Sequence, residues 1–373
     1  MLKFHELTVA QVSPDAEDAV SIAFAVPPEL QAEYLGCAGQ HVVLRLAVDG
    51  EETRRTYSLV NAPGEWPLRI VPRVHAAGKM SRYLADSLRV GERVEVLPPN
   101  GSFTPRRAES GGTFVAFAAG CGITPVLSIV RSLLARANTR VILFYGNTGT
   151  ARTMCLEELL ALKDRYLGRL SLHFVMSREP QEAELYNGRI DAQRVRELAV
   201  KLFSAPQVSE YFVCGPGDMI EQVSTALRGL GVDSARVHAE HFTVTTAGEP
   251  AATAAAGVAV GDVATSAAAA PGAAVERAAN SAEVSVLMDG RRRTFTMKMD
   301  DETVLDAAAR AGIELPFSCR AGVCSTCRTK VISGKVEMAQ NYALEDWEVE
   351  QGYVLACQSH VKTPTLELDY DEK

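Results

Sequence analysis

Residues 319–327 read CRAGVCSTC, so three of the eight cysteines of the chain lie in one short stretch, and a fourth, Cys357, stands alone further on. This C-x4-C-x2-C spacing with one distant cysteine is that of a plant-type [2Fe-2S] site. Structural zinc sites usually combine two close pairs of ligands instead. Small residues let backbone amides approach the sulfur atoms: Ala321, Gly322, Ser325 and Thr326. The stretch predicts an iron–sulfur loop, with zinc or unligated cysteines as the alternatives.

Residues 282–373, which contain this loop, have the pattern of a small α+β unit. EVSVLM and RRRTFTMKM flank an Asp-Gly pair, which is typical of a β-hairpin. TVLDAAARAG has helical spacing and ends at Gly312. TKVISGKVEM, VLACQSHV and TLELDY follow as further strands. The loop is therefore expected to lie in a compact α+β domain.

An alanine-rich segment precedes this unit. Between Ala251 and Asn280, 15 of 30 residues are Ala, and no amphipathic stripe runs through them. Such a composition buries little and is typical of an interdomain linker. We assign residues 244–281 to this linker, so the iron–sulfur unit is expected to be a separate domain.

The region before the linker changes character near residue 107. Over residues 1–106, short runs with period two, such as FHELTVAQV and HVVLRLAV, predict a small antiparallel β-barrel. Over residues 107–243, apolar strands such as TFVAFAAG alternate with helical patterns such as PVLSIVRSLLARA, which predicts a doubly wound parallel sheet. The chain is thus expected to be multidomain, with an antiparallel β-barrel, an α/β parallel-sheet domain and an α+β domain.

The composition of the chain limits the kinds of partner and the cellular compartment that we expect. The formal net charge is −8, and no basic stripe is present, which argues against a nucleic-acid partner. No apolar run reaches the length of a membrane-spanning helix, and the N-terminal residues carry no apolar signal core. We expect a soluble cytoplasmic protein without membrane contact, in which clustered cysteines serve as metal ligands or redox groups rather than as disulfides.

A [2Fe-2S] cluster carries one electron at a time and NAD(P)H delivers two as a hydride, so a flavin is expected between them. RRTYSL (54–59) combines an Arg for phosphate, an aromatic ring for stacking and a hydroxyl for hydrogen bonding. HAAGKMSRYL (75–84) places Gly78 and Ser81 at a helix start, where free amides hold a pyrophosphate. Taken singly, Tyr57 also fits a core position and Ser81 a plain N-cap.

The stretch GCGITPV (120–126) follows a strand and opens a helix. Gly120 and Gly122 let the backbone turn and approach phosphate, Thr124 can cap the helix, and Pro125 suits its first turn. Because its sixth residue is Pro, the stretch is not the G-x-G-x-x-G fingerprint of dehydrogenases.

The stretch FVMSREP (174–180) bears on the choice of nicotinamide. Ser177 and Arg178 stand just past a strand end, where a guanidinium can bind the 2′-phosphate of NADPH. The adjacent Glu179 blurs this signal, since an acid there favours NADH, and a solvated Arg178 is the alternative. NADPH is favoured over NADH.

These motifs, in this order, resemble those of the ferredoxin–NADP reductase superfamily, and PFSCRAGVCSTC (316–327) resembles the loops of plant-type ferredoxin domains. The resemblance implies FAD rather than FMN in the barrel, NAD(P)H in the α/β domain, and a β-grasp fold for the ferredoxin domain. The implied cluster ligands are Cys319, Cys324, Cys327 and Cys357. The implied FAD residues are Arg55, Thr56, Tyr57, Ser58, Arg73, Val74, Gly78, Lys79, Met80 and Ser81.

The same resemblance assigns roles around the nicotinamide. The implied nicotinamide residues are Gly120, Gly122, Thr124, Pro125, Ser177, Arg178, Cys214, Gly215, Pro216 and Met219. Ser58 would contact the ring nitrogen that accepts the hydride, Cys214 would lie beside the nicotinamide, and Glu240 and Phe242 would cover the flavin. The implied catalytic residues are Ser58, Cys214 and Glu240. Relatives often have Thr or Ser where Cys121 stands, which leaves the role of that side chain open.

FHELTVAQVSPDAEDAVSIAFAVP near the N-terminus and NYALEDWEVEQGYVLACQ (341–358) resemble the reductase components of phenylacetyl-CoA epoxidases. This resemblance implies an oxidoreductase that passes electrons from NADPH through FAD and the cluster to a partner, the multisubunit di-iron oxygenase that epoxidises phenylacetyl-CoA. One alternative is the same electron chain serving another aromatic-ring oxygenase. Another is a redox-sensing module that binds the cofactors without turnover.

Overall fold

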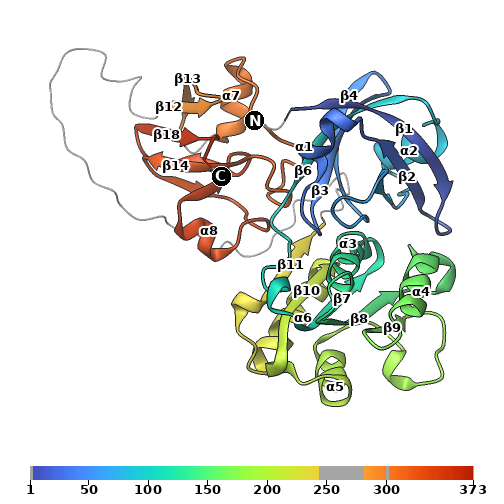
Figure 1. Cartoon of the computed structure of the whole chain (residues 1–373). Helices are drawn as coiled ribbons and strands as arrows, with labels where there is room; N and C mark the ends of the chain where they lie inside the picture. The colour runs from blue at the N-terminus through green and yellow to red at the C-terminus, as the bar shows by residue number, and fades with distance from the viewer. Residues whose placement is uncertain (1–2, 243–280, 300–301, 373) are drawn as a thin grey trace, which may run out of the picture. The chain divides into compact units, whose positions relative to one another are not determined.

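The computed structural model describes residues 3–242, 281–299 and 302–372, which form two compact units, residues 4–242 and residues 281–372 (Figure 1). The first unit holds the β-barrel and the α/β domain, and the second holds the cysteine loop. The alanine-rich segment predicted as a linker lies outside the described residues. Within the described ranges, every helix is too short or too polar to cross a bilayer.

Residues 5–100 form an antiparallel six-stranded sheet in the order β4-β3-β6-β1-β2-β5. Its strands are β1 (His5–Pro14), β2 (Val20–Ala25), β3 (His41–Val48), β4 (Glu51–Ser58), β5 (Leu68–Ile70) and β6 (Arg93–Asn100). A bridge between Leu59 and Ile70 joins the two edge strands and closes the sheet into a barrel. Two helices accompany it, α1 (Gln31–Tyr34) and α2 (Lys79–Asp86). The barrel predicted from the period-two pattern is therefore confirmed.

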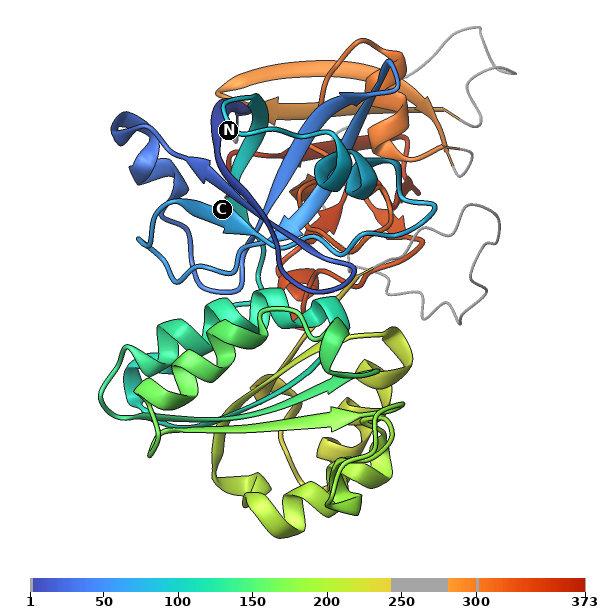
Figure 2. The same cartoon turned by 90° about the vertical axis from the view of Figure 1, so that its right-hand side faces the viewer.

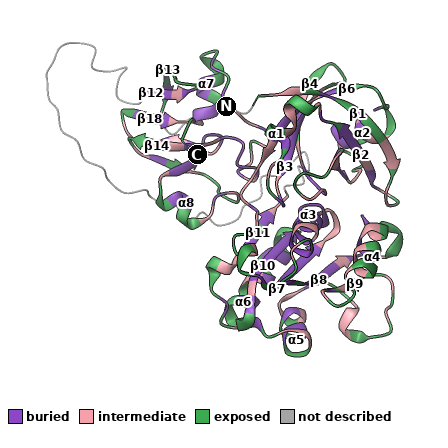
Figure 3. Cartoon of the chain, in the orientation of Figure 1, coloured by how far each residue is buried: buried purple, intermediate pink, exposed green. Residues whose placement is uncertain are grey.

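The next domain is a five-stranded parallel sheet in the order β11-β10-β7-β8-β9. Its strands are β7 (Gly112–Ala119), β8 (Thr139–Asn147), β9 (Leu170–Met176), β10 (Val208–Gly215) and β11 (Val237–His241). Its helices are α3 (Ile123–Leu134), α4 (Leu156–Arg165), α5 (Ala192–Leu202) and α6 (Gly217–Gly229). Helices cover both faces (Figure 2), so β7 and β10 are buried along most of their length (Figure 3). The doubly wound prediction is confirmed.

Alternate residues of the central strands supply two separate cores. Phe114 and Ala116 pack with Leu127 of α3 on one face of the sheet. Val115 and Phe117 pack on the other face, where α5 and α6 lie. The sequence analysis missed α5, because only three of its residues, Val195, Leu198 and Ala199, are buried and polar residues dominate its pattern.

A buried pair, Glu210 and His238, connects two strands of the parallel sheet to the segment that follows the barrel. Glu210 on β10 and His238 on β11 are 1% and 2% exposed, with His238 Nε2 2.9 Å from Glu210 Oε1. Glu210 also accepts hydrogen bonds from the backbone N–H groups of Arg106 and Arg107. Burial acts to raise the pKa of Glu210, but the hydrogen bonds from His238, Arg107 and Arg106 outweigh it and lower the pKa.

Glu210→Ala is expected to destabilise this unit by about 3 kcal/mol, because it removes the carboxylate that buried His238 and the N–H groups of Arg106 and Arg107 share. The midpoint of thermal unfolding, followed by circular dichroism, should fall by roughly 6–12 °C. Since the pKa of Glu210 is lowered by folding, this contribution is present at neutral pH and is lost as the pH falls below the ordinary range for a glutamate. Glu109→Ala, at an exposed ion pair with Arg136, is the control and should leave the midpoint unchanged.

The second unit has a five-stranded sheet in the order β13-β12-β18-β14-β16 and a two-stranded sheet, β15-β17. The strands are β12 (Ser281–Met288), β13 (Arg291–Lys298), β14 (Arg328–Ser333), β15 (Val336–Met338), β16 (Tyr353–Leu355), β17 (Ser359–Val361) and β18 (Thr365–Asp369). The helices are α7 (Val304–Arg310) and α8 (Asp346–Glu350), the second of which was not predicted. Strand β12 begins at Ser281, a residue that the sequence analysis assigned to the linker.

Candidate active site and cluster loop

Three residues predicted to be catalytic come together where the barrel meets the parallel sheet. Ser58 ends β4 and pairs in register with His41 of β3. Cys214 near the end of β10 pairs in register with Glu240 of β11. The carboxyl group of Glu240 faces the barrel, where its Oε1 lies 3.8 Å from Nδ1 of His41, and Ser58 is close enough to affect its pKa. Sheet pairing and this contact bring Ser58, Cys214 and Glu240 to one place.

The side chains at this junction are buried, and burial raises the pKa of both Glu240 and Cys214. Burial raises the pKa of Glu240, although the nearby side chains of His41 and Ser58 partly oppose that effect. Burial, followed by the charges of Glu240 and Cys121, raises the pKa of Cys214 well above its ordinary value, so this thiol stays protonated at neutral pH. His41 Nε2 and Glu240 Oε2 are buried without a hydrogen-bond partner among the described residues, so polar groups are available to a bound molecule.

The glycine-rich turn after β7 packs directly against this junction. A Cβ on Gly122 would lie 2.1 Å from the carbonyl oxygen of Cys214, so only glycine lets the turn approach β10 this closely. Helix α3 begins at Ile123, and no side chain caps its N-terminus. The prediction that Thr124 caps this helix is wrong, because Thr124 lies within the first turn and its hydroxyl donates to the carbonyl of Cys121. The uncapped amides of this turn fit a phosphate.

The residues predicted for FAD lie in two groups on the barrel. Arg55, Thr56 and Tyr57 lie on β4, where Arg55 is exposed and burial raises the pKa of Tyr57. Gly78 is the N-cap of α2, and Ser81 Oγ donates to the carbonyl of Gly78 and accepts from the N–H of His75. Lys79 pairs with Glu51 at 3.0 Å, and Met80 is buried in the barrel core. The flavin roles of these residues stay predictions.

Arg73 and Val74 lie near the edge of the barrel that meets the α/β domain. Arg73 pairs with Asp18 at 3.5 Å and donates to the carbonyl of Arg152. Its guanidinium lies 3.4 Å from the position that a Cβ on Gly120 would take. The N–H of Val74 donates to the carbonyl of Asp18. Arg73 therefore stands beside the glycine-rich turn, as well as near the FAD residues of the barrel.

Ser177 and Arg178 are exposed just past the end of β9, as predicted from their position in the sequence. The carboxylate of the adjacent Glu179 accepts hydrogen bonds from the hydroxyl of Thr150 at 2.6 Å and from its N–H at 2.7 Å. These two bonds lower the pKa of Glu179. The guanidinium of Arg178 has no hydrogen bond or ion pair with the residues that the structure describes. Glu179, whose acidic side chain made the preference for NADPH uncertain in the sequence, is thus hydrogen-bonded to Thr150. The guanidinium of Arg178 is available to an anion.

The remaining nicotinamide residues surround the end of β10. Gly215 ends that strand, and Pro216 precedes α6 as its N-cap. Met219 is 5% exposed, and its Cε lies 2.7 Å from the position that a Cβ on Gly215 would take. Phe242 packs partly buried against the core that contains Cys214.

One residue near these sites, His41, was missed by sequence reasoning. His41 was not singled out, because only the pairing of β3 with β4 places it opposite Ser58. The sequence left no signal for it beyond its place at a strand end.

The cysteine loop holds its four thiols as two pairs. Cys319 hydrogen-bonds with Cys324, and Cys327 hydrogen-bonds with Cys357. A [2Fe-2S] cluster has two iron ions with two protein ligands each, so each pair would supply one iron ion. Cys324, Cys327 and Cys357 are buried at the edge of the core of this unit. The donor set therefore fits the cluster.

Backbone amides of the loop point at these sulfur atoms. The hydrogen bond from Cys324, with N–H groups of Ala321 and Val323, lowers the pKa of Cys319 to about 5 despite burial. The hydrogen bond from Cys327, with the N–H of Gly322, likewise lowers the pKa of Cys357. Gly322 has a φ of +73°, and its Cβ would lie 2.9 Å from the carbonyl of Gln340, so only glycine fits there. A loop that stabilises thiolates is the one that a cluster requires.

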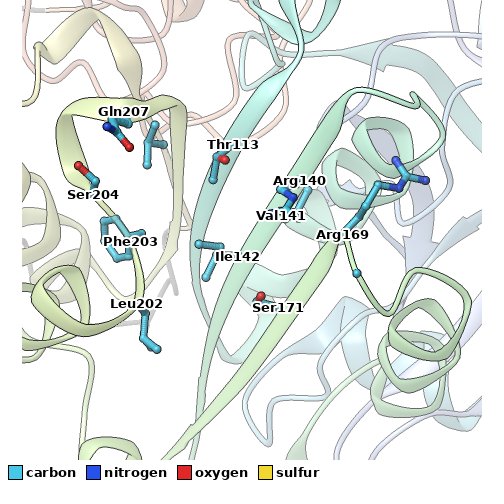
Figure 4. Close-up of a pocket in the computed structure, with 12 residues that line it drawn as sticks. Thr113, Arg140, Val141, Ile142, Arg169, Ser171, Leu202, Phe203, Ser204 and Gln207 are labelled. Atoms are coloured by element: carbon cyan, nitrogen blue, oxygen red, sulfur yellow. The ribbon is translucent and has the colours of Figure 1, made fainter.

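Neither of two other features belongs to these sites. A cavity of about 260 Å³ lies at the amino ends of β7, β8 and β9, lined by Thr113, Arg140, Ser171 and Phe203 among others (Figure 4). Ligands of open α/β sheets bind at the opposite, carboxyl ends, where Gly120 and Ser177 lie. The ligand atoms of Asp15, Cys155 and Glu158 lie within 4.8 Å of one another. Arg69 and Arg131 neutralise Glu158, so this group is a contact between the two domains.

Comparison with protein families gives three matches in the predicted order. Residues 7–104 match the oxidoreductase FAD-binding domain, residues 117–225 the oxidoreductase NAD-binding domain, and residues 286–362 the 2Fe-2S iron-sulfur cluster binding domain. Together the three matches cover most of the chain on both sides of the alanine-rich segment.

Relatives from two bacteria align with the chain over almost its whole length. The chain is 38% identical to a component of the 1,2-phenylacetyl-CoA epoxidase of Escherichia coli, over 100% of this chain and 99% of that protein. It is 35% identical to the ferredoxin reductase component of a 3-ketosteroid-9-alpha-monooxygenase of Rhodococcus rhodochrous, over 98% and 96%. Phthalate dioxygenase reductase has the same fold, with a TM-score of 0.57 and 24% identity over 98% of both chains.

Proposed function

Because the chain belongs to the family of reductases that join an FAD-binding, an NAD-binding and a C-terminal [2Fe-2S] domain, we propose that it carries electrons from NADPH to the oxygenase of a phenylacetyl-CoA epoxidase. The observation that carries this proposal is the arrangement of Cys319 with Cys324 and of Cys327 with Cys357 under backbone N–H donors. An oxygenase reductase needs such a one-electron carrier at its exit. The epoxidase as acceptor is supported by the full-length relative from Escherichia coli.

The chemistry comes from the bound groups: a flavin takes two electrons and a proton equivalent from NADPH as a hydride and gives them up singly, and a [2Fe-2S] cluster passes each on. The residues of the chain position the reactants. With the cofactors bound, Ser58 would offer its hydroxyl to the flavin nitrogen, and the neutral thiol of Cys214 would lie beside the nicotinamide. Glu240, with its raised pKa, holds or releases a proton between Ser58 and His41.

The choice of NADPH rests on the charges at the end of β9. Arg178 is exposed and has no counter-ion among the described residues, and the exposed Ser177 precedes it, with its hydroxyl donating to the carbonyl of Asn147 at 3.3 Å. Thr150 holds the carboxylate of Glu179, so this acid does not neutralise the site. A guanidinium beside a hydroxyl suits the 2′-phosphate that distinguishes NADPH from NADH.

Arg178→Ala is expected to raise the KM for NADPH by roughly 10- to 100-fold, the loss of one charge-assisted bidentate contact. The KM for NADH should change little, since NADH has no phosphate at that position. Steady-state ferricyanide reduction with each nucleotide measures both constants. Arg196→Ala, an exposed arginine on α5, is the matched control and should change neither. Equal increases for NADPH and NADH would contradict the phosphate-binding role.

The acceptor is tested by reconstitution. The purified chain, NADPH and the oxygenase component of a phenylacetyl-CoA epoxidase should convert phenylacetyl-CoA to its ring 1,2-epoxide, detected by mass spectrometry. The oxygenase component of a 3-ketosteroid-9-alpha-monooxygenase, supplied with its own substrate, is the competing arm. Faster turnover in that arm would overturn the assignment of the epoxidase. Failure of NADPH to bleach the flavin absorbance in stopped flow would contradict the reductase function itself.

A further inference from the structure

The cavity at the amino ends of β7, β8 and β9 is separate from the sites described above. It has a volume of about 260 Å³ and lies between the starts of these strands and the segment that joins α5 to β10 (Figure 4). Pockets for drug-sized ligands measure about 300–1,000 Å³, so this cavity suits a smaller molecule. Because the nicotinamide residues lie at the carboxyl ends of the same sheet, a molecule in the cavity would leave them free.

One wall of the cavity consists of polar side chains from neighbouring strands. Arg140 of β8 is in register with Thr113 of β7, and Ser171 of β9 lies beside them on this wall. Because side chains alternate along a strand, Arg140 shares a face of the sheet with Phe144. The ring centroid of Phe144 lies 6.0 Å from that of Phe203, across the cavity from β8. The side chain of Arg140 is therefore on the face of the sheet where Phe203 lies.

Apolar side chains line much of the rest of the cavity. Leu202, Phe203 and Val208 come from the end of α5 and the start of β10, and Ile142 adds to them from β8. Phe203 is only half-buried, although its ring also packs at 6.5 Å from that of Phe117. An apolar surface beside a few polar groups is typical of sites for small molecules that have an apolar body and a polar end.

The charge of the cavity indicates what that polar end is. The guanidinium of Arg140 is exposed and forms no hydrogen bond or ion pair with any residue that the structure describes. That of Arg169 is held instead by the carbonyl groups of Arg136 and Leu134 at the end of α3. The chain contains 46 Asp and Glu residues, but none of the described residues that line the cavity is acidic. The cavity therefore favours an anion.

We propose that this cavity binds a small carboxylate that has an apolar body, with the carboxylate paired to Arg140 and the body against Phe203. A guanidinium presents two parallel N–H groups, which match the two oxygen atoms of a carboxylate. The hydroxyl groups of Thr113 and Ser171, which have no hydrogen bond among the described residues, are further donors at the same wall. The site would be additional to those for the cofactors, and it does not depend on the identity of the electron acceptor.

Benzoate, a carboxylate on a rigid apolar ring, is the probe for this site, and benzamide is its neutral counterpart. Isothermal titration calorimetry on the full chain, purified with its cofactors, should show saturable binding of one benzoate and at least about tenfold weaker binding of benzamide. Arg140→Gln should weaken the binding of benzoate at least about tenfold and leave that of benzamide unchanged. Equal dissociation constants of benzoate for Arg140→Gln and the wild type, or no saturable binding by the wild type, would overturn the proposal.

Two further variants and one competitor show where benzoate binds. Arg196→Gln, at an exposed arginine of α5 outside the cavity, is the matched control and should bind benzoate as the wild type does. Ser171→Phe fills the cavity from an exposed position on β9, where a strand accepts an aromatic residue, and should abolish the binding of both probes. Binding of benzoate by Ser171→Phe at the wild-type affinity would contradict the proposal. So would displacement of benzoate by NADP⁺, since it would place the probe at the nicotinamide site.

The rate of flavin reduction by NADPH should be the same in Arg140→Gln and the wild type, because Arg140 lies at the other end of the sheet from the nicotinamide residues. A slower reduction in this variant would contradict the separation of the two sites.

Discussion

Replacing Cys324 by alanine is expected to abolish the reduction of cytochrome c by NADPH while the reduction of ferricyanide continues. Cys324 is buried, hydrogen-bonds with Cys319 and lies in the loop whose amides surround the thiols. Removing it leaves one iron ion with a single protein ligand. Mutation of a residue that only hydrogen-bonds to a metal ligand typically lowers metal affinity or activity about 10- to 100-fold. Loss of a ligand itself should therefore lower the rate of cytochrome c reduction by more than about 100-fold. Ferricyanide takes electrons at the flavin, so its rate tests the first unit alone.

The measurement combines visible spectra, iron and sulfide analysis, and the two reductase assays on the same preparation. Cys37→Ala is the control, because Cys37 is an exposed thiol on the barrel and lies outside the loop. It should keep the cluster and both activities. Cytochrome c reduction at the wild-type rate by Cys324→Ala, with its cluster absorbance gone, would disprove the proposed path through the cluster. Loss of both activities would contradict the independence of the flavin unit.

Ser58→Ala is expected to slow the reduction of the flavin by NADPH by roughly 100-fold or more, the usual effect of removing a positioned hydrogen-bonding group at a reacting centre. Ser58 is 5% exposed and lies close enough to Glu240 to affect its pKa, and Glu240 pairs in register with Cys214 on the neighbouring strand. Without the hydroxyl, the site would lose the group that is predicted to contact the flavin nitrogen. Stopped-flow absorbance at the flavin band measures the rate directly.

Two companion variants separate this role from a structural one. Ser58→Thr keeps a hydroxyl at the same place and should retain most of the rate. Thr53→Ala, earlier on the same strand β4, should leave the rate unchanged. FAD content and the KM for NADPH should stay close to the wild-type values in all three, because binding uses other residues. Equal rates for Ser58→Ala and the wild type would show that Ser58 takes no part in the transfer.

Much of the fold could be predicted, because its signals are local. The period-two runs of the barrel and the Asp289–Gly290 turn depend on neighbouring residues only, and both residues of that turn have the positive φ expected for a tight hairpin. The helices that were missed had weak local signals: α5 buries only three residues, α1 is four residues long and α8 is five residues long. Thr124 was predicted as a cap, since the residue type favours it, but the turn before α3 makes Gly122 the N-cap, so Thr124 lies two residues past the cap position.

The candidate site was predictable as a set of residues, but its contacts were not. The spacing of the cysteines indicated the cluster ligands, because three of the four lie in the one loop that ends at Cys327. His41 and Glu240 are 199 positions apart, yet Nδ1 of His41 lies 3.8 Å from Oε1 of Glu240. Likewise, the Glu179 carboxylate could be read as favouring NADH until its hydrogen bonds to Thr150 were visible.

The order of the three domains and the chemistry of the cysteine loop follow from the amino-acid sequence, since ligand spacing and hydrophobic period are properties of contiguous residues. Which polar groups have partners became visible in the folded chain, where Glu210 pairs with His238 and Glu179 with Thr150. The physical reason is that strand register and domain packing, which join residues far apart in the chain, determine where a buried proton donor meets its acceptor.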